Sequence, residues 1–381
     1  MASLFTGQDS VTIGPAAIHV AVVGAGLSGA ACAAGLRSAG VQVTLFEKSR
    51  NVGGRMATRR ATWADASGIA HPVSFDHGAH YFTAVRPRFR AALARAAAAG
   101  CVVEWQPIVH ASRSPETTRC FVPTPSMPAL CSHLLAGASL HLNTTVRRLQ
   151  HAADGTWFLA TDDAPLAGPF RHVVVALPPA QAAVLLAGHQ DGWAAALTAR
   201  RMEPRWTLMA VTDDVDWPWD AAELDRNPLA WMSRNDRVPG RTMQPGFAVW
   251  TAHASAEWSA AHLEAEPDVV RDRLRMALQS QLPSFNVAMQ PVRWYHADVQ
   301  RWRYAGAALD GIGGLDGNRT LWDESLGIGV CGDWLGGSGV EAAWHSGDDL
   351  ADNMATSFER VVPASITQTE HIAFPRPTMT R

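Results

Sequence analysis

The sequence predicts an α/β fold in which a domain built on a parallel sheet carries an inserted second domain with a mixed sheet. An apolar, partly β-branched run at residues 18–23 breaks into closely spaced glycines and then into a segment rich in Ala and Leu. A similar run at residues 326–334 also leads through glycines into a helical pattern. Strands that alternate with helices are typical of parallel sheets, and 381 residues suffice for two domains.

A strand, a glycine turn and a helix are expected to follow one another over residues 18–39. The turn has G-x-G-x-x-G spacing, with Gly24, Gly26 and Gly29 as its glycines. Such a turn lets backbone amides at a helix N-terminus approach a pyrophosphate, which is the signature of a Rossmann-type dinucleotide site. The other members of this site are then Ala25, Leu27 and Ser28.

A second strand is expected at residues 41–46 and ends at Glu47. Glu47 lies 47 − 29 = 18 residues beyond Gly29, a spacing at which a carboxylate can accept hydrogen bonds from a ribose. A second glycine pair and two cations follow, with Arg55 placed to meet the same pyrophosphate: Lys48, Gly53, Gly54 and Arg55. Simple NAD enzymes do not need this second pair, so the sequence favours FAD over NAD.

The run at residues 326–334 predicts a buried strand that ends in Gly332 and Asp333 and leads into a helix. A Gly-Asp pair in this place suits the ribityl and phosphate part of FAD, and a helix N-terminus would stabilise negative charge on a reduced flavin. No residue that could tether the flavin is recognisable beside Cys331 or His77, so we expect noncovalent FAD.

Composition excludes several classes of function. The net charge of −3 gives no signal for nucleic acid, and no apolar run is long enough for a membrane span. The five cysteines are scattered, and no metal-ligand spacing is present, so we expect free thiols, no metal and a cytoplasmic protein. The only lysine is Lys48, which excludes Schiff-base chemistry elsewhere and the flavin-facing lysine of many amine oxidases.

The predicted domains are discontinuous. Residues 15–85, 125–185 and 320–360 are expected to form the FAD-binding domain, and residues 86–124 and 186–319 the substrate domain. We expect flexible tails at residues 1–14 and 361–381.

Several motifs together resemble bacterial renalase-type flavoproteins of the flavin amine oxidase superfamily. They are VVGAGLSGAACA, FEKSRNVGGRMATRR, FDHGAHYFTA, WTAHASAEWS, QRWRYA and CGDWLGGSGVEAAWHSG. The resemblance implies a p-hydroxybenzoate hydroxylase-like fold and oxidation of misreduced (2- or 6-dihydro) NAD(P) isomers, with oxygen as acceptor and hydrogen peroxide as product. The alternative is an amine oxidase or desaturase that acts on an amine or apolar substrate. The chain departs from the usual pattern at His77, His80 and His345, which leaves the substrate open.

Further candidate contacts with FAD are Met56, Gly78, Ala79, His80, Tyr81, Val146 and Val340. Candidate contacts with the substrate are His253, Arg301, Trp302, Tyr304 and His80, with Arg301 holding a substrate phosphate. No side chain is identified as catalytic, because a dihydronicotinamide is already a hydride donor and needs no general base.

Overall fold

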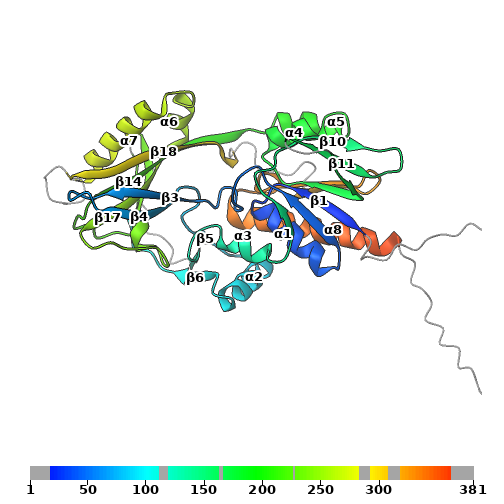
Figure 1. Cartoon of the computed structure of the whole chain (residues 1–381), viewed down its shortest axis with the longest axis horizontal. Coiled ribbons are helices and arrows are strands. Elements are labelled where there is room, and N and C mark those ends of the chain that lie inside the picture. Colours follow the sequence, from blue (N-terminus) through cyan, green and yellow to red (C-terminus); the bar gives the residue numbers. More distant parts are fainter. Residues whose placement is uncertain are drawn as a thin grey trace, which may run out of the picture.

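A computed structural model describes residues 18–110, 119–162, 166–225, 228–282, 292–307 and 318–361. The chain forms two lobes, one around β1 and α8 and the other around β14, β17 and β18 (Figure 1). Of the tails expected at 1–14 and 361–381, every residue except Val361, the last of α8, lies outside the described residues. Within the described ranges, no helix combines the length and the apolar character needed to cross a bilayer.

The first lobe is built on a six-stranded sheet in the order β19-β20-β13-β1-β2-β9, parallel except for the edge strand β19. Its strands are β1 (His19–Val23), β2 (Gln42–Phe46), β9 (Ser139–His141), β13 (His172–Val175), β19 (Thr320–Asp323) and β20 (Ile328–Cys331). The strands β13 and β20 are buried throughout, as expected for the middle of a parallel sheet that is covered on both faces.

Helices cover one face of this sheet, and a small sheet with two helices covers the other. The first layer contains α1 (Leu27–Ser38), α3 (Ala129–Leu134) and α8 (Val340–Val361). The second layer contains β10 (Val146–His151), β11 (Trp157–Thr161), β12 (Ala167–Phe170), α4 (Pro179–Leu186) and α5 (Asp191–Thr198). The glycine turn between β1 and α1 is therefore held at the carboxyl end of a central strand.

The second lobe is built on a mixed six-stranded sheet in the order β18-β14-β17-β16-β15-β7. Its strands are β7 (Val109–His110), β14 (Met202–Asp213), β15 (Ala221–Glu223), β16 (Leu229–Arg234), β17 (Phe247–Ala254) and β18 (Trp294–Ala307). The helices α6 (Ala256–Ala261) and α7 (Pro267–Gln281) lie over one face, where α7 packs against Trp206 and Trp250. The hairpin of β3 (Thr58–Ala64) and β4 (Ala70–Asp76) packs on the other face through Trp63 and Phe75.

Two segments pack across the domain boundaries expected from the sequence. The hairpin β3-β4 was expected in the first domain but contributes to the core of the second sheet. The helix α2 (Pro87–Ala98) was expected in the second domain, but Phe89 and Leu93 are buried in the core that contains α1 and α8. A small sheet lies next to α2 and contains β5 (Phe82–Thr83), β6 (Val102–Trp105) and β8 (Cys120–Pro123).

Candidate active site

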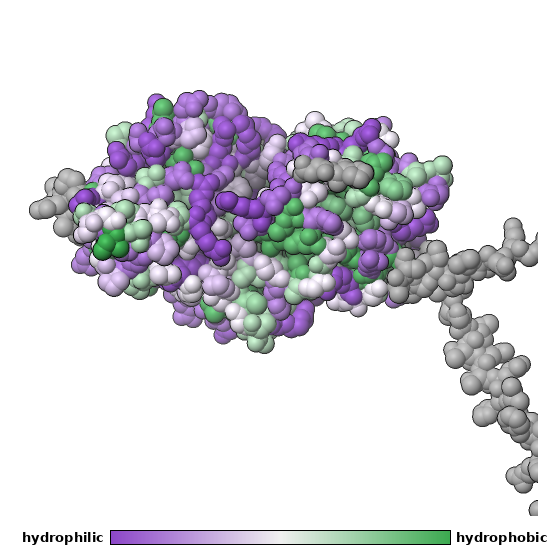
Figure 2. Space-filling view, in the orientation of Figure 1, coloured by the Kyte–Doolittle hydropathy of each residue, from purple (hydrophilic) through white to green (hydrophobic). Residues whose placement is uncertain are grey.

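A pocket of about 1730 Å³ runs from the glycine turn of the first lobe to the strands β14, β17 and β18 of the second. This volume exceeds the roughly 300–1,000 Å³ of a site for one small ligand, so the pocket has room for a dinucleotide and a second molecule. Figure 2 shows a hydrophilic band where the lobes meet, beside a hydrophobic area on the first lobe. Nine basic side chains line the pocket but only two carboxylates, Glu47 and Asp333.

The glycine turn leaves its pocket-facing side open. A Cβ at Gly24 would lie 2.5 Å from the carbonyl oxygen of Ala176, and one at Gly29 would lie 2.0 Å from that of Gly24. At Gly26 the nearest atom would be the Cα of Gly54, at 3.9 Å. Gly26 also precedes the first residue of α1, so the positive end of that helix opens into the free space.

Glu47 is held by the backbone of the two loops beside it. Its Oε2 accepts a hydrogen bond from the amide of Ala25 at 2.9 Å, and its Oε1 accepts one from the amide of Ser49 at 2.8 Å. The side chain is only 7% exposed. A carboxylate has about four acceptor positions, so both oxygens can still accept hydrogen bonds from a ligand.

Arg55 and Asp333 form a bidentate ion pair in the middle of the pocket, with N···O distances of 2.9 and 2.6 Å. Arg55 also donates to the carbonyl oxygen of Ala305 at 3.1 Å, and Asp333 accepts a weaker hydrogen bond from the amide of Gly339. The sequence predicted that Arg55 faces a pyrophosphate. Instead, its guanidinium is already bound to a carboxylate, and it joins the loop after β2 to the turn that follows β20.

The second lobe contributes aromatic and imidazole rings. The carbonyl oxygen of His77, after β4, accepts hydrogen bonds from Trp302 Nε1 at 2.9 Å and from Thr207 Oγ1 at 3.1 Å. The His77 ring stacks on Trp302 with 5.1 Å between ring centroids. His80 Nε2 lies 3.3 Å from His253 Nδ1, so one imidazole donates to the other.

These three histidines are neutral at physiological pH. Loss of water lowers the pKa of His77 to about 4, with a further contribution from the positive charge of Arg59. Burial and then Arg205 lower the pKa of His80 to about 3. Burial, followed by His80 and Arg205, lowers the pKa of His253 well below its usual range. Such weakly basic imidazoles serve as hydrogen-bonding groups rather than as strong general bases.

Arg301 lines the pocket, as the sequence predicted, but its guanidinium is not free to bind a ligand. Its register partner on β14 is Trp206, whose ring lies beneath the Arg301 guanidinium on the face of the sheet covered by α6 and α7. Arg301 donates to the carbonyl oxygen of Leu263 at 2.8 Å and pairs with Glu264 at 3.3 Å. A guanidinium that is already bound to a carboxylate is poorly suited to hold a substrate phosphate.

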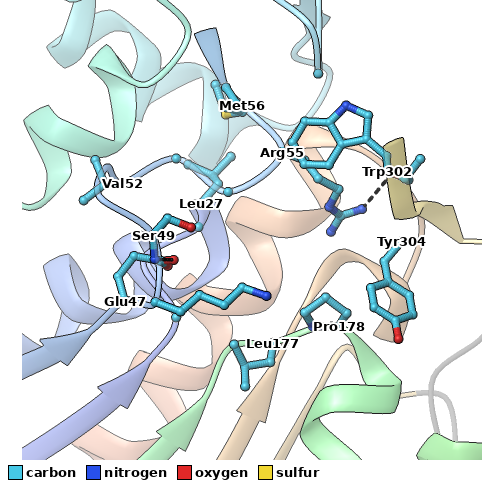
Figure 3. A pocket seen from close by; sticks show the side chains of 18 of the residues that line it. Leu27, Glu47, Ser49, Val52, Arg55, Met56, Leu177, Pro178, Trp302 and Tyr304 are labelled. Atoms are coloured by element: carbon cyan, nitrogen blue, oxygen red, sulfur yellow. Dashed lines mark hydrogen bonds between the residues drawn. The ribbon is translucent and has the colours of Figure 1, made fainter. Parts of the chain in front are cut away.

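Most of the other predicted residues line the pocket. Glu47 and Ser49 lie at one end, and Trp302 and Tyr304 at the other (Figure 3). The predicted residues found in the lining are Gly24, Gly26, Leu27, Ser28, Glu47, Lys48, Gly53, Gly54, Arg55, Met56, Gly78, Ala79, Val146, His253, Arg301, Trp302, Tyr304, Gly332, Asp333 and Val340. The predicted contacts that are not in the lining are Ala25, Gly29, His80 and Tyr81.

Sequence reasoning missed three features of the site. Leu177 and Pro178 follow β13 and form part of the pocket wall (Figure 3). Their position directly after a buried strand could have identified them as pocket residues, because ligands bind at the carboxyl ends of parallel strands. Arg205 also lines the pocket, but nothing in its local sequence marks it.

Three further expectations concern His345, the cysteines and a metal site. His345 is buried on α8 beside Phe89 and Trp344, and its Nε2 lies 3.7 Å from Glu341 one turn earlier. The five cysteines are free. In the ranges given above, no cluster of histidine, cysteine and acidic residues is arranged to hold a metal ion.

Comparisons with known proteins agree with this architecture. Residues 22–96 match an NAD(P)-binding Rossmann-like domain, and residues 121–355 match the family described as flavin containing amine oxidoreductase. A stretch of 39 residues, 10% of this chain, is 60% identical to 4,4'-diapophytoene desaturase (4,4'-diaponeurosporene-forming) from Staphylococcus aureus (strain Newman). The chain spans only 8% of the length of that desaturase.

Three solved structures share the fold over nearly their whole length. Cyclohexylamine oxidase from Brevibacterium oxydans IH-35A has a TM-score of 0.60 and 14% identity, covering 90% of this chain and 100% of that one. Reduced UDP-galactopyranose mutase has a TM-score of 0.62 and 10% identity, and the match covers 91% of this chain and 99% of that one. A CLA-producing fatty acid isomerase from P. acnes has a TM-score of 0.59 and 11% identity, covering 88% and 98%. Their different activities show that this fold does not determine the substrate.

The site is compatible with FAD in three respects. Open space lies in front of Gly26 at the N-terminus of α1, and Glu47 retains free acceptor positions. The N-terminal residues of α8 also line the pocket. Together with the family match over residues 121–355, these features identify FAD as the cofactor. The chain belongs to the flavin containing amine oxidoreductase family, and the protein is an FAD-dependent oxidoreductase.

Proposed function

We propose that the protein is a renalase-like oxidase that oxidises misreduced (2- or 6-dihydro) isomers of NAD(P). The observation that carries this proposal is the charge of the pocket: of its nine basic side chains, four form no salt bridge among the described residues, namely Lys48, Arg50, Arg60 and Arg205. A dinucleotide brings two or more negative charges into such a site, whereas a protonated amine would be repelled. Bound FAD would accept the hydride and transfer the electrons to oxygen, giving hydrogen peroxide.

In this proposal the first lobe holds FAD noncovalently. The amides at the start of α1, after Gly26, would bind the pyrophosphate, and Glu47 would accept hydrogen bonds from the ribose. Asp333 and the first turn of α8 would lie along the rest of the cofactor. The remaining contacts proposed from the lining are Gly24, Leu27, Ser28, Lys48, Gly53, Gly54, Met56, Gly78, Ala79, Val146, Gly332 and Val340.

The second lobe would bind and orient the substrate. Trp302 and Tyr304 offer flat surfaces for a nicotinamide or adenine ring, and His253 offers a neutral polar group. None of His77, His80 and His253 is a strong base, because burial lowers the pKa of each. This arrangement suits a substrate that is already a hydride donor, since no proton has to be removed from it.

The main alternative is oxidation of an amine or desaturation of an apolar substrate. The family description and the short match to a desaturase are as consistent with this alternative as with the first proposal. The two differ in the charge of the substrate, and charge can be tested directly.

The test is anaerobic reduction of the purified holoenzyme, measured as the loss of the flavin absorbance. The 2- and 6-dihydro isomers are expected to bleach the flavin at least 100-fold faster than ordinary 4-dihydro NADH or simple primary amines. The reason is positional, because each 1.4 kcal/mol of lost alignment slows hydride transfer about tenfold. Rapid reduction by amines, or none by any dihydronicotinamide, would support the alternative instead.

A further inference from the structure

Arg205 is a cation in the pocket that has no anionic partner among the residues that the structure describes. It lies on β14, opposite Trp302 of β18, and lines the pocket on the side of the second lobe. Within the ranges that the structure describes, the side chain of Arg205 forms neither a salt bridge nor a hydrogen bond. Three other arginines on this side are neutralised, since Arg59 pairs with Asp298 and both Arg301 and Arg303 pair with Glu264. Arg60, on β3, has no ion pair among the described residues but is exposed to solvent.

The Arg205 side chain is partly buried, and its guanidinium has no acceptor among the described side chains. Burial lowers the pKa of Arg205, and Glu203 offsets this effect only by attraction from a distance, without forming an ion pair. A guanidinium has five N–H donors in a planar fork. An anion with several oxygens can accept two of these hydrogen bonds at once, so a ligand phosphate would suit Arg205.

The groups next to Arg205 support the same role. His80 and His253 both respond to its positive charge, and both imidazoles are neutral. His253 Nε2 is buried and has no hydrogen-bond partner among the described residues. Arg205 and His253 line the same pocket, so one ligand group could meet a charged fork and a neutral polar nitrogen together.

We infer that Arg205, with His253 beside it, forms the subsite that binds a phosphate group of the substrate. This inference rests on the proposed function, because the proposed substrate is the one that carries the phosphate. Arg205 is then a specificity-determining residue: it selects dinucleotides over uncharged dihydronicotinamides without taking part in hydride transfer.

The first test measures anion binding by the FAD-loaded protein, using inorganic pyrophosphate and the shift of the flavin absorbance. Pyrophosphate is expected to bind to the wild type. Its affinity for Arg205→Gln should be lower by roughly tenfold or more. Its affinity for Arg205→Lys should be intermediate, because lysine keeps the positive charge but not the planar fork of donors. The control is Arg271→Gln, which removes the same charge from the exposed face of α7 and should bind like the wild type. The assignment would be overturned if pyrophosphate did not bind to the wild type, or if it bound equally to the wild type and both Arg205 variants. It would also be overturned if malonate, a dicarboxylate without phosphate, bound more tightly than pyrophosphate.

The second test separates substrate selection from a structural effect. Reduction by a 2-dihydro dinucleotide is compared with reduction by the matching dihydronicotinamide riboside, which has no phosphate. Arg205→Gln should raise the dissociation constant of the dinucleotide roughly tenfold or more, with little change for the riboside and in the limiting reduction rate. Equal weakening of both substrates would mean that Arg205 acts only on structure. If no dihydronicotinamide reduces the flavin but pyrophosphate binding still depends on Arg205, the proposed function fails and the anion subsite stands.

Discussion

The three glycines of the turn after β1 are needed for three different physical reasons. Gly24 has a φ of +104° and lies against the carbonyl oxygen of Ala176, so it serves the turn itself. Gly29 leaves no room for a side chain between α1 and the turn. Gly26 meets no protein atom closer than 3.9 Å, so a side chain at this position would affect the ligand rather than the fold.

We therefore expect Gly26→Asp to lose FAD while it remains folded. The added carboxylate would occupy the space in front of the α1 N-terminus and repel a pyrophosphate, so the affinity for FAD should fall at least 100-fold. The measurement is the FAD content of the purified protein, with circular dichroism as the check on folding. Gly192→Asp is the matched control, because Gly192 is exposed on α5 and has open space around it. A Gly26→Asp variant that retains stoichiometric FAD would show that the turn does not bind the pyrophosphate.

At the scale of single residues, spacing alone predicted the carboxylate after β2 but not Arg205. Glu47 was identified because it follows the glycine turn at a fixed distance along one βαβ unit. Arg301 was chosen from its motif, but strand register places it on the face covered by α6 and α7. Arg205 lies next to an irregularity in the pairing of β14 with β18, and a local sequence pattern cannot show on which face such a residue lies.

At the scale of elements, the local βαβ unit was predicted closely, while the distant pairings were not. The observed β1, α1 and β2 lie within one or two residues of the expected segments. The strand expected at 326–334 is shorter, Ile328–Cys331, because the chain turns at Gly332. The hairpin β3-β4 was missed as a hairpin, since its stability depends on packing against Met209 and Val211, more than 130 residues away.

His77, directly after β4, should make stability depend on pH. In the folded protein the pKa of His77 is about 4, against 6.5 without burial. Between pH 6.5 and about 4, His77 is therefore protonated in the unfolded chain but neutral in the folded protein. The contribution of neutral His77 to the free energy of unfolding is fully present above pH 6.5. It is lost as the pH falls to about 4, by roughly 1.4 kcal/mol per pH unit. Urea unfolding at pH 7, 6 and 5 should show a steeper loss for the wild type than for His77→Asn. Parallel curves for the two proteins would contradict this account.

At the scale of the whole molecule, the pair of Arg55 and Asp333 joins three distant parts of the chain. Arg55→Ala would leave Asp333, 1% exposed, as a buried and unpaired carboxylate, and would remove the hydrogen bond to Ala305 of the second lobe. We expect a loss of roughly 3 kcal/mol in the free energy of unfolding, measured by urea titration with excess FAD. The control Arg271→Ala breaks an exposed pair and should change the free energy by less than 1 kcal/mol. A loss as small as that of the control would mean that the pair does not hold these segments together.

The strand order of the parallel sheet also constrains how the protein can mature during synthesis. β1 emerges first from the ribosome but lies between β2 and β13, and β13 pairs in turn with β20 near residue 330. The glycine turn is therefore made about 300 residues before the strand and helix that complete its pocket. Nascent chains fold late when their contacts join distant parts of the sequence. We therefore expect the complete FAD pocket to form only after β20 and α8 have been translated, and until then β13 lacks its neighbour β20.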